Sequence, residues 1–256
     1  MRRLLASLFL MAATIFAVAE TTFLTNTINK NFIGYAYDLE TGELIYTEHH
    51  KYTSHNIHEV QYKEVIGEVF ASKTVNYENN DYAPDFIQKN SRNGERIESK
   101  RDSNGILISY QENSSSSMDS NFIRSNPKLI IDAGFDKFIT KNWKELVSGQ
   151  EMTIDYLIPS SLDHYELNIT KEDCKDNNFH CFSISSSSFF ISLLSSKLML
   201  KYEEISNESS NVSDDGNTSG ERIRLISFKG RSNICDSEGN YHDVNIQYQY
   251  ENSHTL

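Results

Sequence analysis

Two cysteines lie close together in the chain and are the residues best placed for covalent or metal chemistry. Cys174 and Cys181 flank the segment KDNNFH between two predicted strands, where a disulfide can close a hairpin in an oxidising compartment. In the chain-entropy model, so short a loop contributes about 2–3 kcal/mol. Zinc binding by Cys174, His180 and Cys181 is the alternative, although the chain shows no second paired motif to complete such a site. Cys235 is left over, either as a buried free thiol or as the partner of one of the other two.

Four histidines crowd one predicted hairpin, namely His49, His50, His55 and His58. Adjacent residues of a strand point to opposite faces, so His49 and His50 cannot both bind one metal ion from regular β-structure. His50 and His58 can face each other across a turn near Ser54. Because three or four ligands are normally needed for a metal site, the pattern favours a polar hairpin, and we expect no metal.

Sequence motifs for catalysis are missing. The chain contains no G-x-S-x-G, H-E-x-x-H, P-loop or G-x-G-x-x-G pattern. The carboxylate pairs Asp132/Asp136 and Asp155/Asp163 have spacings that suit helix capping and solvated faces better than an acid/base pair. We therefore expect that the protein is not an enzyme and that it binds no cofactor.

The first residues have the pattern of a secretion signal. Arg2 and Arg3 precede an apolar run from Leu4 to Phe16, and Ala17-Val18-Ala19 forms a small-x-small site before Glu20. The run is shorter than the about 20 apolar residues that span a membrane, and no later segment approaches that length. We therefore expect residues 1–19 to be removed, leaving an exported chain with no transmembrane segment. The periplasm of a Gram-negative bacterium is the expected location.

The remaining chain, residues 20–256, is predicted to form a single β-rich domain. No Pro/Gly/Ser-rich linker divides it into halves that could each bury a core, and no internal repeat is visible. The net charge of −12 becomes −12 − 2 = −14 once Arg2 and Arg3 are removed. Such a charge repels phosphate backbones, so nucleic acid is excluded as an expected partner.

Alternating residues predict a series of antiparallel strands. The segment FIGYAYDLETGELIYTEHHKY forms a predicted hairpin with its turn at Glu40-Thr41-Gly42. In its second strand, Leu44, Tyr46, Glu48, His50 and Tyr52 share one face. Further strands are predicted at 58–63, 68–77, 85–90, 96–100, 106–111, 152–158, 165–170, 181–185, 198–203, 222–229 and 243–250. The stretch from Ser114 to Ser120 is predicted to be a polar loop.

A single amphipathic helix is predicted from about Ala133 to Val147. Asp132 can cap its start, and Gly149 sits where a left-handed C-cap belongs. Its apolar face consists of the candidate ligand-groove residues Phe135, Phe138, Ile139, Trp143 and Leu146, together with Val147. A helix of this length measures roughly 22 Å, whereas 11 or 12 strands make a sheet wider than about 50 Å. We therefore predict a mainly β fold in which one curled antiparallel sheet, a half-barrel of about 11–12 strands, grips the helix.

Two other segments interrupt the strand pattern. The apolar stretch SSFFISLLSS at 187–196 fits a helix plugging the same groove or a buried strand, and periodicity does not separate the two. The acidic segment at 204–220, EISNESSNVSDDGNTSG, cannot bury enough apolar area to offset its ordering entropy. We expect this segment to be a mobile loop at a hairpin tip.

Several stretches taken together are similar to a known group of proteins. The order GYAYDLETGELIYTEHH, DAGFDKFITKNW, IDYLIPSSLDHYELNI and LISFKGRSNI resembles an uncharacterised family of exported proteobacterial proteins, over nearly the whole mature chain. At the level of architecture, the strand count and central helix also look like the half-barrel of periplasmic lipoprotein carriers and outer-membrane receptor proteins. That second resemblance implies a fold that holds acyl chains between a curled sheet and helices, and it does not establish a ligand.

Two functions from different classes follow from these expectations. The first is a binding module that encloses an apolar ligand, such as a lipid or acyl chain, between the sheet and the helix. The alternative is an envelope structural or interaction protein with a filled core and no small ligand. If the apolar lining of the sheet extends beyond the area that the helix covers, the binding module is favoured. The sequence leaves the oligomeric state open.

Overall fold

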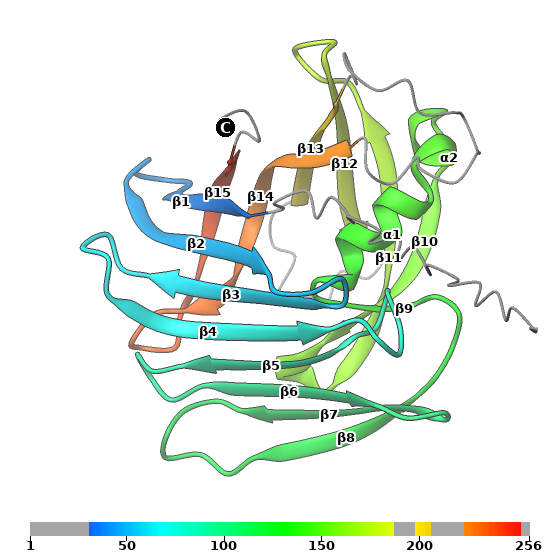
Figure 1. The fold of residues 1–256 in the computed structure, drawn as a ribbon. Helices are drawn as coiled ribbons and strands as arrows, with labels where there is room; N and C mark the ends of the chain where they lie inside the picture. Colours follow the sequence, from blue (N-terminus) through cyan, green and yellow to red (C-terminus); the bar gives the residue numbers. More distant parts are fainter. Residues whose placement is uncertain (1–30, 187–197, 206–222, 252–256) are drawn as a thin grey trace, which may run out of the picture.

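The computed structural model describes residues 31–186, 198–205 and 223–251. The predicted signal peptide (1–19), the ambiguous apolar segment (187–196) and almost all of the predicted mobile loop (204–220) lie outside the described residues. Within them, the fold is one large sheet accompanied by two short helices (Figure 1). This confirms the predicted mainly β class, with a curled sheet and a helix.

The sheet contains 15 strands and remains open. The strands are β1 (Phe32–Asp38), β2 (Leu44–Tyr52), β3 (Ile57–Lys63), β4 (Val69–Asn76), β5 (Asp85–Asn90), β6 (Arg96–Arg101), β7 (Gly105–Gln111), β8 (Asp119–Arg124), β9 (Leu129–Ile131), β10 (Met152–Ile158), β11 (Asp163–Glu172), β12 (Phe179–Ser186), β13 (Leu198–Glu204), β14 (Ile223–Cys235) and β15 (Tyr241–Tyr250). Their order is β8-β7-β6-β5-β4-β3-β2-β1-β15-β14-β13-β12-β11-β10-β9, so β8 and β9 are the two edges. All neighbours are antiparallel except β9 and β10, which are parallel.

The predicted count of 11 or 12 strands is too low, and the predicted segments include neither β8 nor β9. In β8 only Ile123 is buried, so the strand lacks the alternation that reveals a buried face. The loop predicted from Ser114 to Ser120 therefore ends where β8 begins, at Asp119. β9 has only three residues, all of them buried, which is too short a run to show any period.

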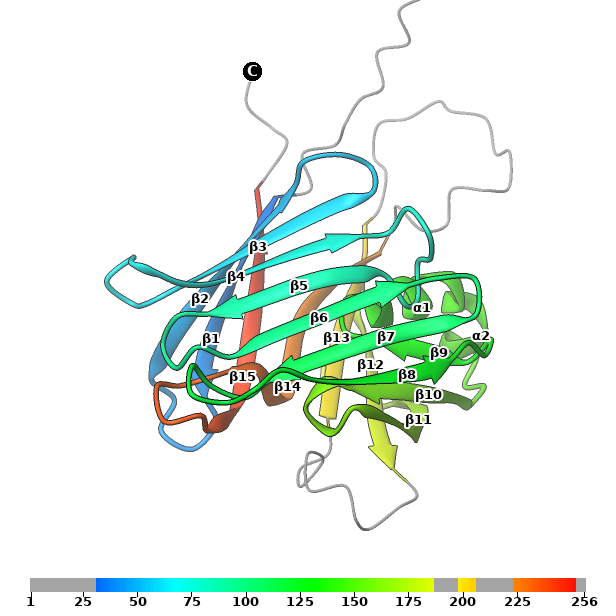
Figure 2. The ribbon, with the colours of Figure 1, turned by 90° about the horizontal axis from the view of Figure 1, so that it is seen from below.

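The two ends of the sheet fold toward each other. Val75 on β4 and Ile108 on β7 belong to one buried cluster with Ile131 on β9 and Leu157 on β10. Figure 2 shows the resulting arrangement, in which β2–β8 form one layer and β10–β15 lie behind it. The concave face of the curled sheet is therefore the interior of the protein.

The predicted helix is present but is broken in two. α1 spans Gly134–Lys141 and α2 spans Trp143–Val147, separated by Asn142 at φ −103° and ψ 23°. Asn142 Nδ2 donates to the carbonyl oxygen of Phe138 at 2.8 Å, so this side chain bonds to the backbone at the break. Gly149 has a φ of 92°, in agreement with the predicted left-handed end. A single 3-10 turn, η1 (Pro159–Ser161), follows β10.

The prediction that Asp132 caps the helix is wrong. α1 has no side-chain N-cap, and the Asp132 carboxylate instead pairs with Lys73 Nζ on β4, at 2.7 Å and 2.8 Å from its two oxygens. The Lys73 side chain is only 2% exposed and would otherwise be an uncompensated buried charge, which is far more costly than an uncapped helix start. Gly134 also packs closely here, since a Cβ atom would lie 1.9 Å from the carbonyl oxygen of Tyr82. The start of the helix is thus fixed against β4 and the loop that follows it.

We predict that Trp143→Ala lowers the free energy of unfolding by about 3–5 kcal/mol, because truncating a buried aromatic side chain leaves a cavity. Trp143 is 7% exposed, packs edge-on against Phe182 and Tyr202, and donates its indole N–H to Glu204 at 2.9 Å. The measurement is urea unfolding followed by circular dichroism. Trp143→Phe is the control: it keeps an aromatic ring, loses the indole donor and a small part of the buried volume, and is expected to cost about 1–2 kcal/mol. A loss below about 0.5 kcal/mol for Trp143→Ala would show a peripheral helix.

Candidate functional site

The five residues predicted to line a ligand groove lie on the two helices and face strands β9–β13. Ile139, Trp143 and Leu146 are buried, with exposed fractions of 0%, 7% and 0%, whereas Phe135 and Phe138 are half-buried. They share one cluster with apolar residues of the sheet, namely Ile130, Ile154, Leu167, Ile169, Phe182, Ile184, Leu200 and Tyr202. Side chains of the described residues therefore already fill the space between the helices and the sheet.

A second part of the concave face lies beside the helices, on β13–β15 and β1 (Figure 1). Pairing registers put Leu225 opposite Tyr202, Phe228 opposite Leu200, and Phe32 opposite Tyr250 on this face. The half-buried apolar and aromatic residues here are Phe32, Leu198, Ile223, Leu225, Phe228, Tyr248 and Tyr250. We call this set the lateral lining. It extends the apolar interior beyond the strands that the helices cover.

One end of the lateral lining continues into a row of stacked rings. Tyr52 stacks on His58 with ring centroids 4.3 Å apart, and His58 stacks on His50 at 5.2 Å. His50 in turn stacks on Phe32 at 4.2 Å, and Phe32 lies 4.8 Å from Tyr250. These rings come from β2, β3, β1 and β15, so the row crosses the middle of the sheet. Each good ring pair adds about 0.5–1.5 kcal/mol beyond area burial, which makes this part of the wall rigid.

A hydrogen-bonded chain of polar side chains lies next to the stacked rings. Glu48, only 3% exposed, has its Oε2 3.1 Å from His50 Nε2, and His50 Nδ1 lies 3.1 Å from His58 Nε2. The Tyr248 hydroxyl donates to the same Glu48 oxygen at 3.4 Å. Gly34 is paired with both Glu48 and Tyr248, and a Cβ atom on it would lie 2.8 Å from the Tyr248 ring. The missing side chain of Gly34 thus allows Tyr248 to reach across β1 to Glu48.

The chemistry of the groups fixes the direction of hydrogen bonding in this chain. A carboxylate only accepts hydrogen bonds, so His50 Nε2 donates to Glu48. In a neutral His50 the Nδ1 atom then accepts, and His58 Nε2 donates to it. His58 Nδ1 is left as an acceptor that is buried and has no partner in the part of the chain that the structure describes. A proton on that atom would be a buried charge without an acceptor.

The charge state of His58 follows from its surroundings. Burial lowers the pKa of His58 well below its ordinary value, and the neighbouring His50, Lys73 and Lys137 lower it further. His58 is therefore neutral at neutral pH. His49, on the opposite face of β2, bonds to Thr47 at 3.1 Å and takes no part in the chain. This confirms that His50 and His58 face each other while His49 points away.

Three phenol groups of the concave face interact with the exposed Asp136 carboxylate of α1. The Tyr202 hydroxyl donates to Asp136 Oδ1 at 3.0 Å. Burial, with the Asp136 carboxylate adding to it, raises the pKa values of Tyr52, Tyr202 and Tyr250. The three phenols therefore stay protonated and serve as hydrogen-bond donors rather than as bases.

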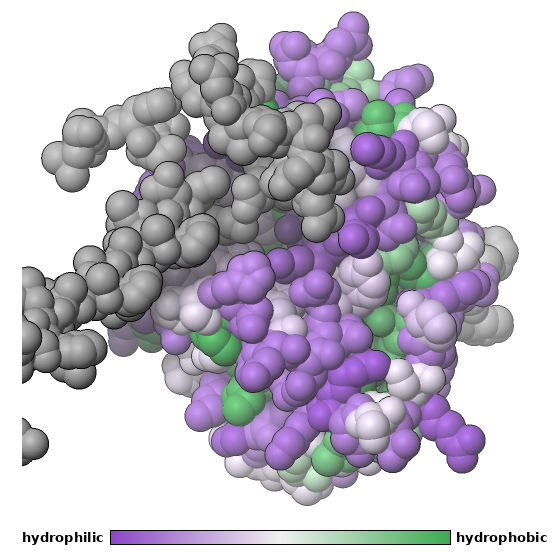
Figure 3. Space-filling view, turned by 45° about the vertical axis from the view of Figure 1, so that its right-hand side comes forward, coloured by the Kyte–Doolittle hydropathy of each residue, from purple (hydrophilic) through white to green (hydrophobic). Residues whose placement is uncertain are grey.

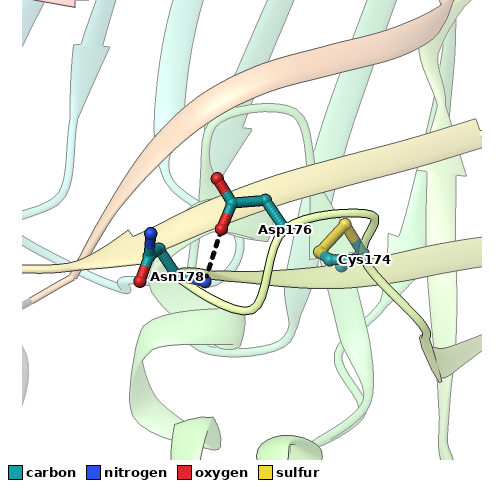
Figure 4. The surroundings of a disulfide bond; sticks show 4 residues. Cys174, Asp176 and Asn178 are labelled. Carbon is teal, nitrogen blue, oxygen red and sulfur yellow. Dashed lines mark hydrogen bonds between the residues drawn. A yellow bond between two sulfur atoms is a disulfide. The ribbon is translucent and has the colours of Figure 1, made fainter.

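The predicted disulfide between Cys174 and Cys181 is confirmed, with a Cα–Cα distance of 5.4 Å. It closes the connection between β11 and β12, where the Asn178 backbone N–H also donates to Asp176 Oδ1 at 3.0 Å (Figure 4). The alternative zinc site is wrong, because both thiolates are consumed by the bond. His180 instead packs edge-on against Trp143 and lies 3.6 Å from Glu204. The bond thus braces the strands on which α2 rests.

Cys235 is the free thiol of the described part and is buried at the end of β14. Its sulfur accepts from Asn90 Nδ2 at 3.3 Å and from Asn93 Nδ2 at 3.2 Å. Burial, with the Glu95 carboxylate adding to it, raises the pKa of this thiol to about 11. Since the thiolate is the nucleophilic form, Cys235 is an unreactive packing group at neutral pH.

Within residues 31–186, 198–205 and 223–251, no group of three or more His, Cys, Asp or Glu side chains is arranged to hold a metal ion. No helix in the same ranges is long and apolar enough to cross a membrane.

The polar chain was only partly visible in the sequence. Alternation in the hairpin placed Glu48 and His50 on the same face as Tyr46. The spacing of two residues between Tyr46, Glu48 and His50 was the signal that a carboxylate lies on an aromatic, inward-facing side of the strand. Tyr248 lies 200 positions away from Glu48, so no local pattern could identify it as a partner.

Comparison with known proteins adds no relative. No protein-family model, curated protein or solved structure matches the chain. The resemblance to an exported proteobacterial family and the architectural likeness to lipoprotein carriers therefore stay predictions.

We predict that His58 makes the fold less stable as the pH falls. The pKa of His58 is depressed in the folded protein. Below about pH 6.5 the unfolded chain therefore binds a proton at this group that the folded chain does not bind. The free energy of unfolding then declines by about 1.4 kcal/mol per pH unit because of this group. Urea unfolding near pH 7 and pH 5.5 should show that the wild type loses about 1 kcal/mol more than His58→Phe does. His55→Gln, at an exposed position, is the control and should behave as the wild type. An equal loss in His58→Phe would contradict this assignment.

Proposed function

We propose that the protein is exported and binds an apolar ligand, a lipid or acyl chain, on the lateral lining of its concave face. One observation carries the proposal: the apolar interior is more extensive than the strands that α1 and α2 cover. Leu225, Phe228, Phe32 and Tyr250 are half-buried and line the concave side by register. Covering apolar surface of this kind contributes about 25 cal/mol per Å², which is the driving force expected for such a ligand.

The proposed position differs from the space between helix and sheet that the sequence suggested. Side chains such as Ile139, Trp143 and Leu146 occupy that space, and a ligand there would have to displace well-packed residues. Beside the helices, the stacked rings supply a rigid wall, and Glu48, His50 and the Tyr248 hydroxyl supply polar groups at one end. This combination suits a ligand with a long apolar part and one polar end.

Export and a periplasmic location are part of the proposal. The N-terminal pattern ending at Ala19 supports secretion, and the Cys174–Cys181 disulfide is compatible with an oxidising compartment. The chain is proposed to reach the periplasm of a Gram-negative bacterium.

A structural or interaction role in the envelope is the second candidate. The observation that favours it is the burial of Ile139, Trp143 and Leu146 of the helical stripe against β9–β13. In that case the interior is a packed core, and the half-buried residues of the lateral lining are its margin.

Native mass spectrometry of the protein purified from the periplasm separates the two candidates. Binding predicts a co-purified lipid mass that disappears after delipidation and returns when lipid is added. A clean apo mass, with no uptake of lipid, would favour the structural role.

We further predict that Leu225→Gln weakens binding of a fluorescent long-chain fatty acid by about tenfold, because a leucine contact contributes about 1.5–3 kcal/mol. The matched control is Ile87→Gln, an apolar residue of β5 that is 43% exposed and lies on the opposite face of the sheet from the buried Phe86 and Gln88. This variant should bind as the wild type does. Equal loss in both variants, or no loss in Leu225→Gln, would contradict binding at the lateral lining.

A further inference from the structure

Three loops converge at one end of the curled sheet and line an open cavity of about 220 Å³. They are the β4–β5 loop, the β6–β7 turn and the β8–β9 link, which lie together at the right of both ribbon views (Figures 1 and 2). The cavity is lined by Asn80, Tyr82, Arg101, Ser125, Asn126, Pro127 and Leu129. A second hollow of about 350 Å³ shares Asn80 and Arg101 with it and adds Asn79, Asp102 and Ser103. Arg101 is thus the cation common to both.

The Arg101 guanidinium has no carboxylate partner in the part of the chain that the structure describes. Its Nη2 donates to Ser125 Oγ at 2.6 Å, and its backbone N–H donates to Asp85 Oδ1 at 2.7 Å. Four other arginines each pair with a carboxylate, namely Arg92 with Glu64, Arg96 with Glu98, Arg224 with Glu203 and Arg231 with Asp243. In a chain with a net charge of −12, an arginine that lines a cavity without such a partner is notable. Its planar fork of N–H groups matches an oxyanion.

The side-chain oxygens of the neighbouring amides are held in local turns. Asn80 Oδ1 accepts from the backbone N–H groups of Tyr82 and Ala83, at 2.9 Å and 2.8 Å. Asn126 Oδ1 accepts from the Lys128 N–H at 2.8 Å. These local turns occupy the side-chain oxygens and fix which end of each amide is nitrogen. The two Nδ2 atoms are the donors that these turns leave available.

The Ser125 hydroxyl also offers a hydrogen-bond donor. Its oxygen accepts from Arg101, and its O–H stays available to donate to a further group. Asp102 is the acidic residue of the second hollow, and its Oδ1 accepts from the Asn104 and Gly105 N–H groups at 2.7 Å and 3.0 Å. The first cavity thus gathers a guanidinium, two amide nitrogens and a hydroxyl, all as donors.

We propose that the cavity at Arg101 binds a small oxyanion, a carboxylate or sulfate group, through Arg101, Asn80, Ser125 and Asn126. The anion receives hydrogen bonds from the guanidinium, the two amide nitrogens and the hydroxyl, and Pro127 and Leu129 form the apolar part of the lining. The face of the molecule that comes forward in Figure 3 is predominantly hydrophilic, with small separate apolar patches, as suits a polar ligand. The acidic charge of the whole chain acts weakly here, because the screening length is about 8 Å at physiological ionic strength.

This site is independent of the lateral lining. It is built from the β4–β5, β6–β7 and β8–β9 connections, whereas the lateral lining lies on β13–β15 and β1. Binding at one can therefore fail without affecting the other.

The test is titration of the labelled protein with sodium sulfate, followed by nuclear magnetic resonance of the Arg101 Nε–H and the side-chain amides. Saturable shifts of Arg101, Asn80 and Asn126 are expected, and sodium chloride at matched ionic strength should not produce them. Arg101→Gln should raise the dissociation constant at least about tenfold, since hydrogen bonds to charged groups are the strong ones. Arg124→Gln is the matched control, because Arg124 is an exposed arginine outside the cavity, and it should bind as the wild type does. Equal shifts with chloride, or unchanged binding in Arg101→Gln, would overturn the proposal.

A second variant covers the case in which Arg101→Gln does not fold. Asn126→Asp keeps the oxygen that accepts from Lys128 and replaces the amide donor with a carboxylate, so it should abolish sulfate binding. Retained binding in this variant would also overturn the site. Titration with glucuronate identifies the source of the anion: binding about tenfold tighter than sulfate assigns the cavity to an acidic saccharide, and equal binding assigns it to a free inorganic anion.

Discussion

The buried ion pair between Lys73 and Asp132 is the contact on which the rest of the fold depends. Lys73 lies on β4, in one half of the sheet, and Asp132 follows β9, at the far edge of the other half. Asp132 has a φ of 45°, a left-handed conformation that Asp tolerates better than most residues. The Lys73 side chain is 2% exposed and that of Asp132 is 18% exposed, so the pair lies largely out of water. It holds the start of the helix against β4 while the helical stripe packs on β9–β13.

This geometry divides the concave face into two parts with different chemistry. Under the helices the interior is apolar and filled, with Leu146 and Phe182 in one cluster. Beside them, the face carries the half-buried lateral lining, the stacked rings and the Glu48–His50–His58 chain. A sheet of 15 strands is too wide for one short helix to cover, so a second, partly open region follows directly from the architecture. The proposed binding role depends on that region.

Features set by local sequence were predictable, and features set by distant contacts were not. The first hairpin, the apolar stripe of the helix and the Cys174–Cys181 bond each involve residues close in the chain, and all were found where predicted. β8 and β9 carry too little alternation or length to be recognised. The partner of Asp132 lies 59 positions away, so a capping role was the best local interpretation. The proximity of Glu48 to Tyr248 likewise depends on Gly34, whose lack of a side chain has meaning only once the strands are paired.

A double-mutant cycle between Lys73 and Asp132 tests this account most directly. Asp132→Asn introduces a residue that also tolerates the left-handed conformation, but it leaves the buried ammonium group of Lys73 unpaired. It should lower the free energy of unfolding in urea by about 3–5 kcal/mol. Lys73→Met should cost less, because the Asp132 side chain that remains is the more exposed partner. The double variant should then be more stable than the sum of the two losses implies, with a coupling of about 1–3 kcal/mol. Losses that add to within about 0.5 kcal/mol would contradict the claim that this pair joins the two halves of the sheet.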